Sequence, residues 1–192
     1  MIVPDKKYNL IYADPPWKYD DARTSKSAGM ALSAYPCMTV EQLIDLPIKQ
    51  LCQSGTMLAM WATFPKLPQA LQVLDGWGFT YSTVLFTWVK LNPKHDSFTT
   101  YPVNHEDIYS GLGHYTRANC EVVLLGRYGN TQPLSRATRD LRQVFFYPRG
   151  RHSEKPAIVR TFLTTLFGKE ISKIELFARE KVEGWDAWGN EV

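Results

Sequence analysis

An apolar run stopped by two consecutive prolines is the feature that most constrains this chain. The run Tyr8–Ala13 is mostly aliphatic and aromatic, and Asp14, Pro15, Pro16 and Trp17 follow it directly. Short apolar runs of this kind are typical of buried β-strands, and proline ends a strand because it fixes its own φ and lacks a backbone N–H. We therefore expect a buried strand that ends in a turn at Asp14.

The turn after this strand offers hydrogen-bond acceptors and few donors. The Asp14 carboxylate and the Pro15 carbonyl can each accept a hydrogen, whereas Pro15 and Pro16 have no N–H to donate. The exocyclic amino group of a nucleobase has the opposite need, because its lone pair is delocalised into the ring. Trp17 adds a flat face on which a base can stack. The turn thus predicts a site for a nucleobase amino group, although Asp-Pro-Pro is also an ordinary way to leave a strand.

Length and composition limit the classes of protein that the chain can represent. Its 192 residues are 44% hydrophobic and 21% charged, which predicts a single globular domain over residues 1–192. Three widely spaced cysteines (Cys37, Cys52 and Cys120) favour reduced thiols over a disulfide frame or a metal site. Because the chain shows neither a signal pattern nor an apolar run of about 18 residues, we expect a cytoplasmic protein without a membrane partner.

Positive charge is concentrated in one part of the sequence. Between Leu134 and Arg160 there are seven basic residues and two acidic ones, so this stretch carries +5 and the rest of the chain −2. A basic region on a nearly neutral body suits a polyanionic partner such as nucleic acid. The same charges are also consistent with a plain solvated face.

Two long stretches, 18–35 and 90–119, have neither a helical nor a strand period. The first is polar and rich in serine, and it follows the proline turn. The second interleaves basic side chains with aromatic rings, which is what an extruded or single-stranded nucleic acid requires for phosphate contact and stacking. We expect both to be substrate-facing loop insertions, although the second can also be read as a loop with packed tyrosines.

Elsewhere, strand-like runs alternate with helical segments. We expect further strands at 56–62, 79–89, 120–126, 143–147 and 173–178, and helical segments at 39–52 (with an interruption at Pro47), 65–76 and 156–167. This alternation predicts an α/β fold with a parallel or mostly parallel sheet covered on both faces. Ligands of such sheets bind beyond the carboxyl ends of the strands. Because Asp14 and Arg179 both follow strands, we expect them to share one crevice.

Five further blocks carry a family resemblance. They are YPCMTVEQL from Tyr35, GHYTRANCEVVLLG from Gly113, RHSEKPAIV from Arg151, KIELFAR from Lys173 and GWDAWGNE from Gly184. In this order after Asp-Pro-Pro-Trp, they make the chain resemble the DPPW-type N6-adenine methyltransferases. That family holds the catalytic subunit of the eukaryotic messenger-RNA adenosine methyltransferase and many bacterial and phage DNA adenine methyltransferases.

The resemblance extends over nearly the whole chain and implies a fold. The expected fold is a Rossmann-like, S-adenosylmethionine-dependent methyltransferase fold in circularly permuted order, with the catalytic block first and the cofactor block last. It also implies S-adenosyl-L-methionine as the cofactor and no metal. The chain has no glycine-rich G-x-G loop, which suits a cofactor without phosphate.

The resemblance further implies roles for single residues. Lys155 is expected at the methionine end of the cofactor, Arg179 near its ribose, and Asn190 near its ribose and adenine. The catalytic set is Asp14, Pro15, Pro16 and Trp17. The cofactor set is Asp14, Ser153, Lys155, Phe177, Arg179, Asn190 and Glu191. The substrate set is Tyr19, Tyr35, Trp61, Lys90, His114 and Tyr115.

Some positions depart from the family pattern. Glu180, Lys181 and Val182 stand where the family often has a histidine or an asparagine, and Glu191 stands where a glutamine is expected. Only residues 1–7 precede the catalytic strand. We therefore expect one wall of the cofactor site to be built differently or to be shared with a partner.

The implied activity is transfer of a methyl group from S-adenosylmethionine to N6 of adenine in DNA. Three alternatives stay open: adenosine methylation in RNA, cytosine N4 methylation, and a non-catalytic nucleic-acid-binding subunit. The short chain favours DNA over RNA, the aspartate of the turn disfavours cytosine, and the intact turn disfavours a silent subunit. A homodimer or an association with a partner subunit also stays open.

Overall fold

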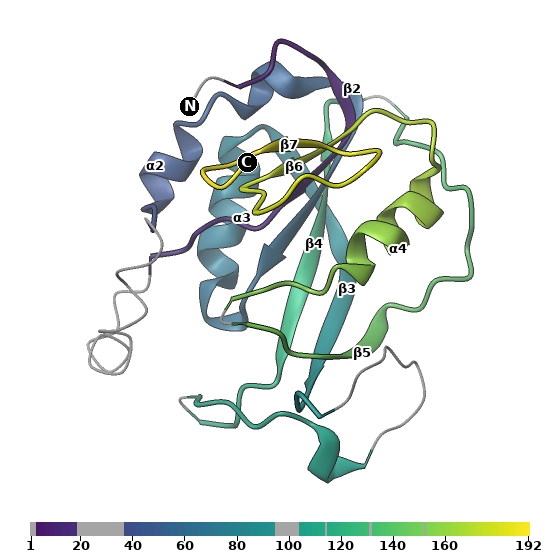
Figure 1. Ribbon diagram of the computed structural model, residues 1–192. Helices are drawn as coiled ribbons and strands as arrows, with labels where there is room; N and C mark the ends of the chain where they lie inside the picture. Colours follow the sequence, from purple (N-terminus) through teal and green to yellow (C-terminus); the bar gives the residue numbers. More distant parts are fainter. Residues whose placement is uncertain (1–2, 19–36, 95–103, 114, 131, 152) are drawn as a thin grey trace.

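A seven-stranded β-sheet forms the centre of the computed structural model, which describes residues 3–18, 37–94, 104–113, 115–130, 132–151 and 153–192. The strands lie in the spatial order β5-β3-β4-β2-β1-β6-β7 (Figure 1). Their bounds are β1 (Tyr8–Ala13), β2 (Cys52–Ala62), β3 (Phe79–Leu91), β4 (Cys120–Tyr128), β5 (Val144–Pro148), β6 (Lys173–Leu176) and β7 (Asp186–Trp188). The strand predicted before the proline turn is thus confirmed as β1, with β2 on one side and β6 on the other.

All of these strands except β4 run in the same direction. Parallel pairs join β1 to β2 and β6, β6 to β7, and β3 to β5, whereas β4 is antiparallel to both of its neighbours, β2 and β3. The carboxyl ends of the parallel strands and the amino end of β4 therefore meet at one edge of the sheet. The mostly parallel sheet predicted from the sequence is confirmed, and this edge is where ligands are expected to bind.

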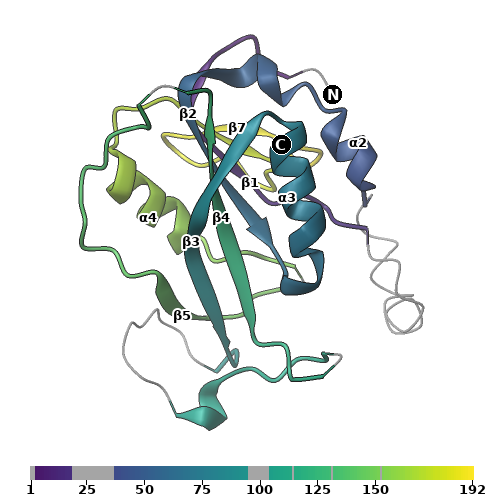
Figure 2. The ribbon, with the colours of Figure 1, turned by 180° about the vertical axis from the view of Figure 1, so that it is seen from behind.

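Helices cover both faces of the sheet, as the continuous apolar strands predict (Figures 1 and 2). One face packs against α2 (Val40–Ile44), η1 (Ile48–Leu51) and α3 (Leu67–Gly76), and the other packs against α4 (Ile158–Phe167). Neighbouring residues of a strand serve opposite faces. In β1, Ile11 joins the α2/α3 side of the core and Tyr12 joins the α4 side.

The helix boundaries follow the signals in the sequence. Thr39 and Gln42 form a capping box at the start of α2, with the Thr39 hydroxyl accepting from the Gln42 N–H and the Gln42 amide oxygen accepting from the Thr39 N–H. The predicted interruption at Pro47 separates α2 from η1. A short 3₁₀ turn, η2 (Phe64–Lys66), precedes α3, and Gly168 ends α4 with φ of 100°. Within the described residues no helix is long and apolar enough to cross a membrane.

Two features of the sheet were not predicted. The antiparallel direction of β4 cannot be read from its apolar run, and β7 is too short to show a strand period. The strand order of the sheet is consistent with the expected methyltransferase fold. The circular permutation stays a prediction.

The end of β7 is fixed by a close backbone approach. The Ala178 N–H donates to the Trp188 carbonyl at 3.1 Å, and a Cβ placed on Gly189 would lie 2.4 Å from the Ala178 oxygen. Because this oxygen belongs to the backbone, the chain cannot make room by turning a side chain. Gly189 therefore holds the segment after β7 against the segment after β6.

We expect Gly189→Ala to lower the free energy of unfolding by about 1–3 kcal/mol, because the added methyl group overpacks this backbone contact. Denaturant unfolding measures the change. Asn190→Ala, at the next and exposed position, serves as the control and should unfold like the unchanged protein. Equal stability of all three proteins would show that the contact is loose.

Candidate active site

Asp14 lies where β1 leaves the sheet, at the carboxyl edge. Its side chain is 22% exposed, so it is neither buried in the core nor free in solvent. The following turn is tight: the Trp17 N–H donates to the Pro15 carbonyl at 2.9 Å, and the Met38 N–H donates to the Pro16 carbonyl at 2.8 Å. The Pro15 oxygen keeps a second lone pair for another donor.

Four side chains of alternating charge, the four-charge cluster (Asp14, Lys155, Glu121 and Lys90), meet at this edge. The Lys155 ammonium lies 3.1 Å from Oδ1 of Asp14 and 3.3 Å from Oε2 of Glu121, and Lys90 lies 2.5 Å from Oε1 of Glu121. Each residue comes from a different element: the end of β1, the segment before α4, the start of β4 and the end of β3. The antiparallel direction of β4 is what brings Glu121 to this edge.

Burial sets the electrostatics of the cluster. Burial raises the pKa of Asp14 above its ordinary value, Glu121 raises it further, and the positive charges of Lys155 and Arg179 act against this rise. Burial also opposes ionisation of Glu121, but Lys155 and Lys90 outweigh it and lower the pKa of Glu121. The two carboxylates in turn raise the pKa of Lys155 despite its burial, so this lysine stays charged.

Two tryptophans form the floor beneath the lysines. The Lys155 ammonium lies 5.8 Å from the centre of the Trp61 ring, and the Lys90 ammonium lies 5.1 Å from the Trp88 ring. The two indoles contact each other edge to face, and Nε1 of Trp61 donates to the hydroxyl of Tyr12 at 2.6 Å. Low-polarity walls of this kind strengthen the ionic contacts above them.

The structure brings part of the predicted cofactor set to the same edge. The positive charge of Arg179 acts to lower the pKa of Asp14, so the residue after β6 lies near the residue after β1. This proximity agrees with the shared crevice expected from the sequence. The Ser153 carbonyl accepts a long 3.5 Å contact from Lys155. Asn190 and Glu191 follow β7 and are exposed.

Two residues of that set have strained backbone. Ser153 and Phe177 both have φ of 60°, a region that non-glycine residues rarely adopt. Phe177 is buried and contacts Trp188 edge to face. Such strain costs about 1–3 kcal/mol and concentrates at binding sites, so its presence at these two positions is consistent with a functional role.

The predicted substrate set is only partly assembled. Tyr19, Tyr35 and His114 lie outside the described residues. Trp61 is fully buried and Lys90 is paired with Glu121, so both support the site from below in this structure. Tyr115 is fully exposed on the loop after β3, and Trp17 is 8% exposed and packs on the α2/α3 side of the core, where it also borders a cavity.

The basic region and the aromatic loop predicted as nucleic-acid contacts meet at the end of β3. The Arg149 guanidinium lies 4.1 Å from the centre of the Tyr109 ring. Backbone hydrogen bonds fix both residues to β3, from the Tyr109 N–H to the Lys90 carbonyl and from the Arg149 N–H to the Leu91 carbonyl. This pair thus lies beside the four-charge cluster.

Sequence reasoning missed Glu121 and the ion pair beneath the cofactor side of the site. Arg160 of α4 contacts both oxygens of Glu175 of β6, at 2.6 and 3.1 Å, and also contacts Glu180. The available signal was a lone acid inside an apolar run, in CEVVLLG and in KIELFA. A carboxylate in a buried strand requires a cation, so each run pointed to an unidentified partner.

Metal chemistry has no support in the described part of the chain. No group of three histidine, cysteine, aspartate or glutamate side chains there could hold a metal ion.

Comparison with known proteins connects this arrangement to a family. The MT-A70 family model matches residues 8–191. The chain is 35% identical to the Type II methyltransferase M.MunI of Mycoplasma sp, over 99% of this chain and 80% of that protein. It is 23% identical to the N(6)-adenine-specific methyltransferase METTL4 of Mus musculus and 25% identical to the N6-methyladenosine RNA methyltransferase MTA1 of Pyricularia oryzae. The match with METTL4 extends over 97% of this chain and 38% of METTL4. The match with MTA1 extends over 96% of this chain and 47% of MTA1.

We expect Lys155→Met to raise the pKa values of both Asp14 and Glu121, because the variant removes the cation that lies between them. Carboxyl NMR titration measures both groups. Lys90→Met is the matched control: it should raise the pKa of Glu121, which Lys90 contacts, and change Asp14 less. An unchanged Asp14 pKa in Lys155→Met would contradict the geometry described above.

Proposed function

Because the chain belongs to the MT-A70 family and is a methyltransferase, we propose that it transfers a methyl group from S-adenosylmethionine to N6 of adenine in DNA. The observation that carries the proposal is the position of Asp14. This carboxylate lies at the carboxyl edge of the sheet, beside a proline carbonyl, and is held by Lys155. It is the acceptor that an exocyclic amino group requires.

The residues around Asp14 fit S-adenosylmethionine by their chemistry. Two of the three Lys155 hydrogens face Asp14 and Glu121. Among the described residues, the third has the long contact with the Ser153 carbonyl, so it can bind the methionine carboxylate. Arg179 and Asn190 are exposed polar side chains at the same edge and suit ribose hydroxyls and a base edge. When bound, S-adenosylmethionine supplies an electrophilic methyl group on a sulfonium.

The catalytic turn would orient the target amino group. Asp14 accepts one N–H and the second lone pair of the Pro15 carbonyl accepts the other. These two hydrogen bonds fix the amino group and favour localising its lone pair on nitrogen, where it can attack the methyl group. Attack on the methyl group would break its bond to sulfur, which would keep the electron pair and leave as a neutral thioether. N6 would then be positive, and the Asp14 carboxylate would stabilise this charge and could take the surplus proton. Because burial raises the pKa of Asp14, it is a stronger proton acceptor than an aspartate in water.

The charges of the four-charge cluster act on the Asp14 carboxylate in opposite directions. Lys155 acts to lower the pKa of Asp14. Because the same ammonium group also pairs with Glu121, Asp14 does not have this cation to itself. If Asp14 paired with Lys155 alone, its carboxylate oxygens would be less available to accept a hydrogen bond from the target amino group. Most of the rate enhancement would thus come from positioning and electrostatics.

Nucleic acid as the substrate is supported by the Arg149–Tyr109 pair beside the cluster. A guanidinium stacked on an aromatic ring offers both a phosphate contact and a face for an unpaired base. The target base must leave the stack, at a cost of a few kcal/mol. Higher identity to the Type II methyltransferase than to the RNA methyltransferase supports DNA, and the latter relative keeps RNA as the second candidate.

A cytoplasmic location is part of the proposal. The three cysteines are free in the structure, and burial raises the pKa of the Cys52 thiol to about 12. A thiol kept protonated is a poor nucleophile, which suits a structural role in a reducing compartment.

Asp14→Ala should lower methyl transfer to DNA by at least about 100-fold, because it removes the acceptor that orients the amine and stabilises its developing charge. The assay counts N6-methyladenine by mass spectrometry after incubation with labelled S-adenosylmethionine and DNA or RNA. Asp75→Asn, an exposed acid on α3, is the control and should keep full activity. Near-normal turnover by Asp14→Ala would overturn the proposal, and methylation of RNA alone would select the second candidate.

Glu121→Gln should move the acid limb of the kcat/KM profile to lower pH. Activity requires ionised Asp14 and is lost as pH falls through its pKa. Among the charged side chains with the largest effect on Asp14, Lys155 and Arg179 lower its pKa and Glu121 raises it, while Glu175 and Tyr12 are also coupled to Asp14 and remain unchanged in this variant. Neutralising Glu121 therefore lowers that pKa, whereas the exposed Glu183→Gln should leave the limb in place. A limb that moves to higher pH would contradict the assigned role of Glu121.

A further inference from the structure

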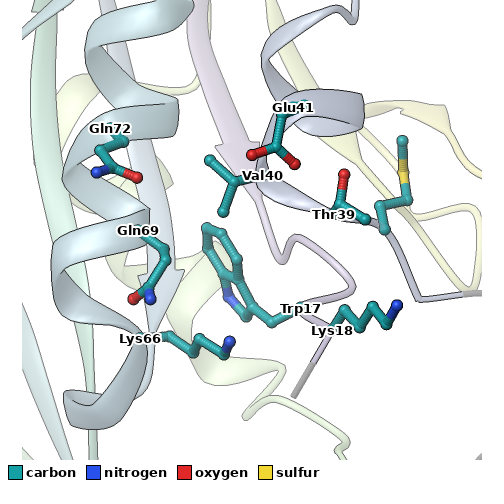
Figure 3. Close-up of a pocket in the computed structure, with 9 residues that line it drawn as sticks. Trp17, Lys18, Thr39, Val40, Glu41, Lys66, Gln69 and Gln72 are labelled. Carbon is teal, nitrogen blue, oxygen red and sulfur yellow. The ribbon is translucent and has the colours of Figure 1, made fainter. Parts of the chain in front are cut away.

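A cavity opens beside the catalytic turn, on the α2/α3 side of Trp17. Its volume is about 340 Å³, which is within the usual range for small-molecule sites. Figure 3 shows the Trp17 indole between α3, with Gln69, and the start of α2, with Glu41. The lining residues are Trp17, Lys18, Met38, Thr39, Val40, Glu41, Lys66, Gln69 and Gln72.

The cavity is distinct from the four-charge cluster but close to it along the chain. Trp17 follows Asp14 by three residues, and three residues of extended chain reach at most about 11 Å. That reach is comparable to the spacing between neighbouring nucleotides of an extended strand. A nucleic acid whose target base is at Asp14 can therefore place an adjacent base in this cavity.

The lining favours a nucleobase over a simple anion. Lys18 and Lys66 bring positive charge, but the Glu41 carboxylate lies among the same lining residues and would repel a lone phosphate. Gln69 and Gln72 are three residues apart on α3 and so present their amides on one face of the helix. Amides pair a donor with an acceptor, as the edge of a base does, and the indole of Trp17 supplies an apolar contact.

Gln69 has an unsatisfied hydrogen-bond acceptor. Its Oε1 atom is buried, and it accepts no hydrogen bond from the described residues. A buried acceptor left without a donor is unfavourable, and rotation of the Gln69 amide toward the cavity would let a ligand N–H relieve it. A glutamine that accepts through Oε1 and donates through Nε2 matches N6 and N7 of adenine.

We propose that this cavity binds the base next to the target adenine and that Gln69 selects adenine there. The inference rests on the proposed function, since it assigns sequence preference to the same nucleic-acid substrate. Lys18 and Lys66 line the cavity on either side of the Trp17 indole (Figure 3), where they can contact the phosphates that flank the bound base.

The test uses duplex DNA substrates that differ only in the base on the 5′ or the 3′ side of one target adenine. For the unchanged protein we expect kcat/KM to be at least about tenfold higher with adenine on one of these sides, the discrimination typical of one bidentate contact. Gln69→Leu should reduce this preference to about twofold or less. Gln50→Leu, an exposed glutamine on η1, is the matched control and should keep it.

A second variant guards against simple loss of structure. Gln69→Glu can accept but not donate, so its preference should move from adenine to cytosine, whose N4 amino group donates. No adenine preference in the unchanged protein, an unchanged preference in Gln69→Leu, or an equal loss on all substrates would overturn the inference.

Failure of the proposed function gives a different result, namely no methylated adenine on any DNA with the unchanged protein. In that case fluorescence anisotropy with the same oligonucleotides tests the cavity alone. Weaker binding of adenine-flanked DNA by Gln69→Leu than by Gln50→Leu supports the inference, and equal binding of the whole series overturns it.

Discussion

The rest of the site depends on one ammonium group placed between two carboxylates. Lys155 lies within 3.1 Å of Asp14 and 3.3 Å of Glu121, in a place where each of these acids alone would be costly to ionise. Removing one member of such a buried set leaves an unpaired charge and costs about 3–5 kcal/mol. The lysine therefore does two things at once: it allows two strands to end in charged residues at one edge, and it keeps Asp14 available as an acceptor.

Sheet topology explains why these charges meet. A parallel sheet gathers carboxyl ends, which accounts for Asp14 and Lys90, but it would send the amino end of a strand to the opposite edge. Because β4 is inserted antiparallel between β2 and β3, its first residues, including Glu121, arrive at the carboxyl edge. One reversed strand thus supplies the counter-charge that a fully parallel sheet would lack. For Glu175 of the parallel strand β6, the counter-charge comes instead from a helix, through Arg160 of α4.

The strand before the proline turn, the capping box at Thr39 and the covered, mostly parallel sheet could be predicted because each depends on local sequence. Glu121 could not be placed, because its role depends on the direction of β4, which apolar periodicity does not encode. Trp61 and Lys90 were predicted as substrate contacts from residue type alone. The burial of Trp61 and the pairing of Lys90 with Glu121 depend on neighbours that are distant in sequence, so residue type could not predict them, and the substrate role of both residues stays a prediction.

Trp17 shows how the turn can serve two sites. Two prolines fix the direction of the chain after Asp14, and the hydrogen bond from Met38 to the Pro16 carbonyl holds the following residues against the start of α2. The indole is consequently driven into the core, where one side packs and the rest borders the cavity with Gln69. The stacking of a base on Trp17 expected from the sequence stays a prediction, and the part of the indole available to a ligand is the part that borders the cavity. The Trp17 indole lies along the chain between the acceptor at Asp14 and the cavity lined by the amides of α3. A shift of the turn or of α3 would therefore change the distance between Asp14 and these amides.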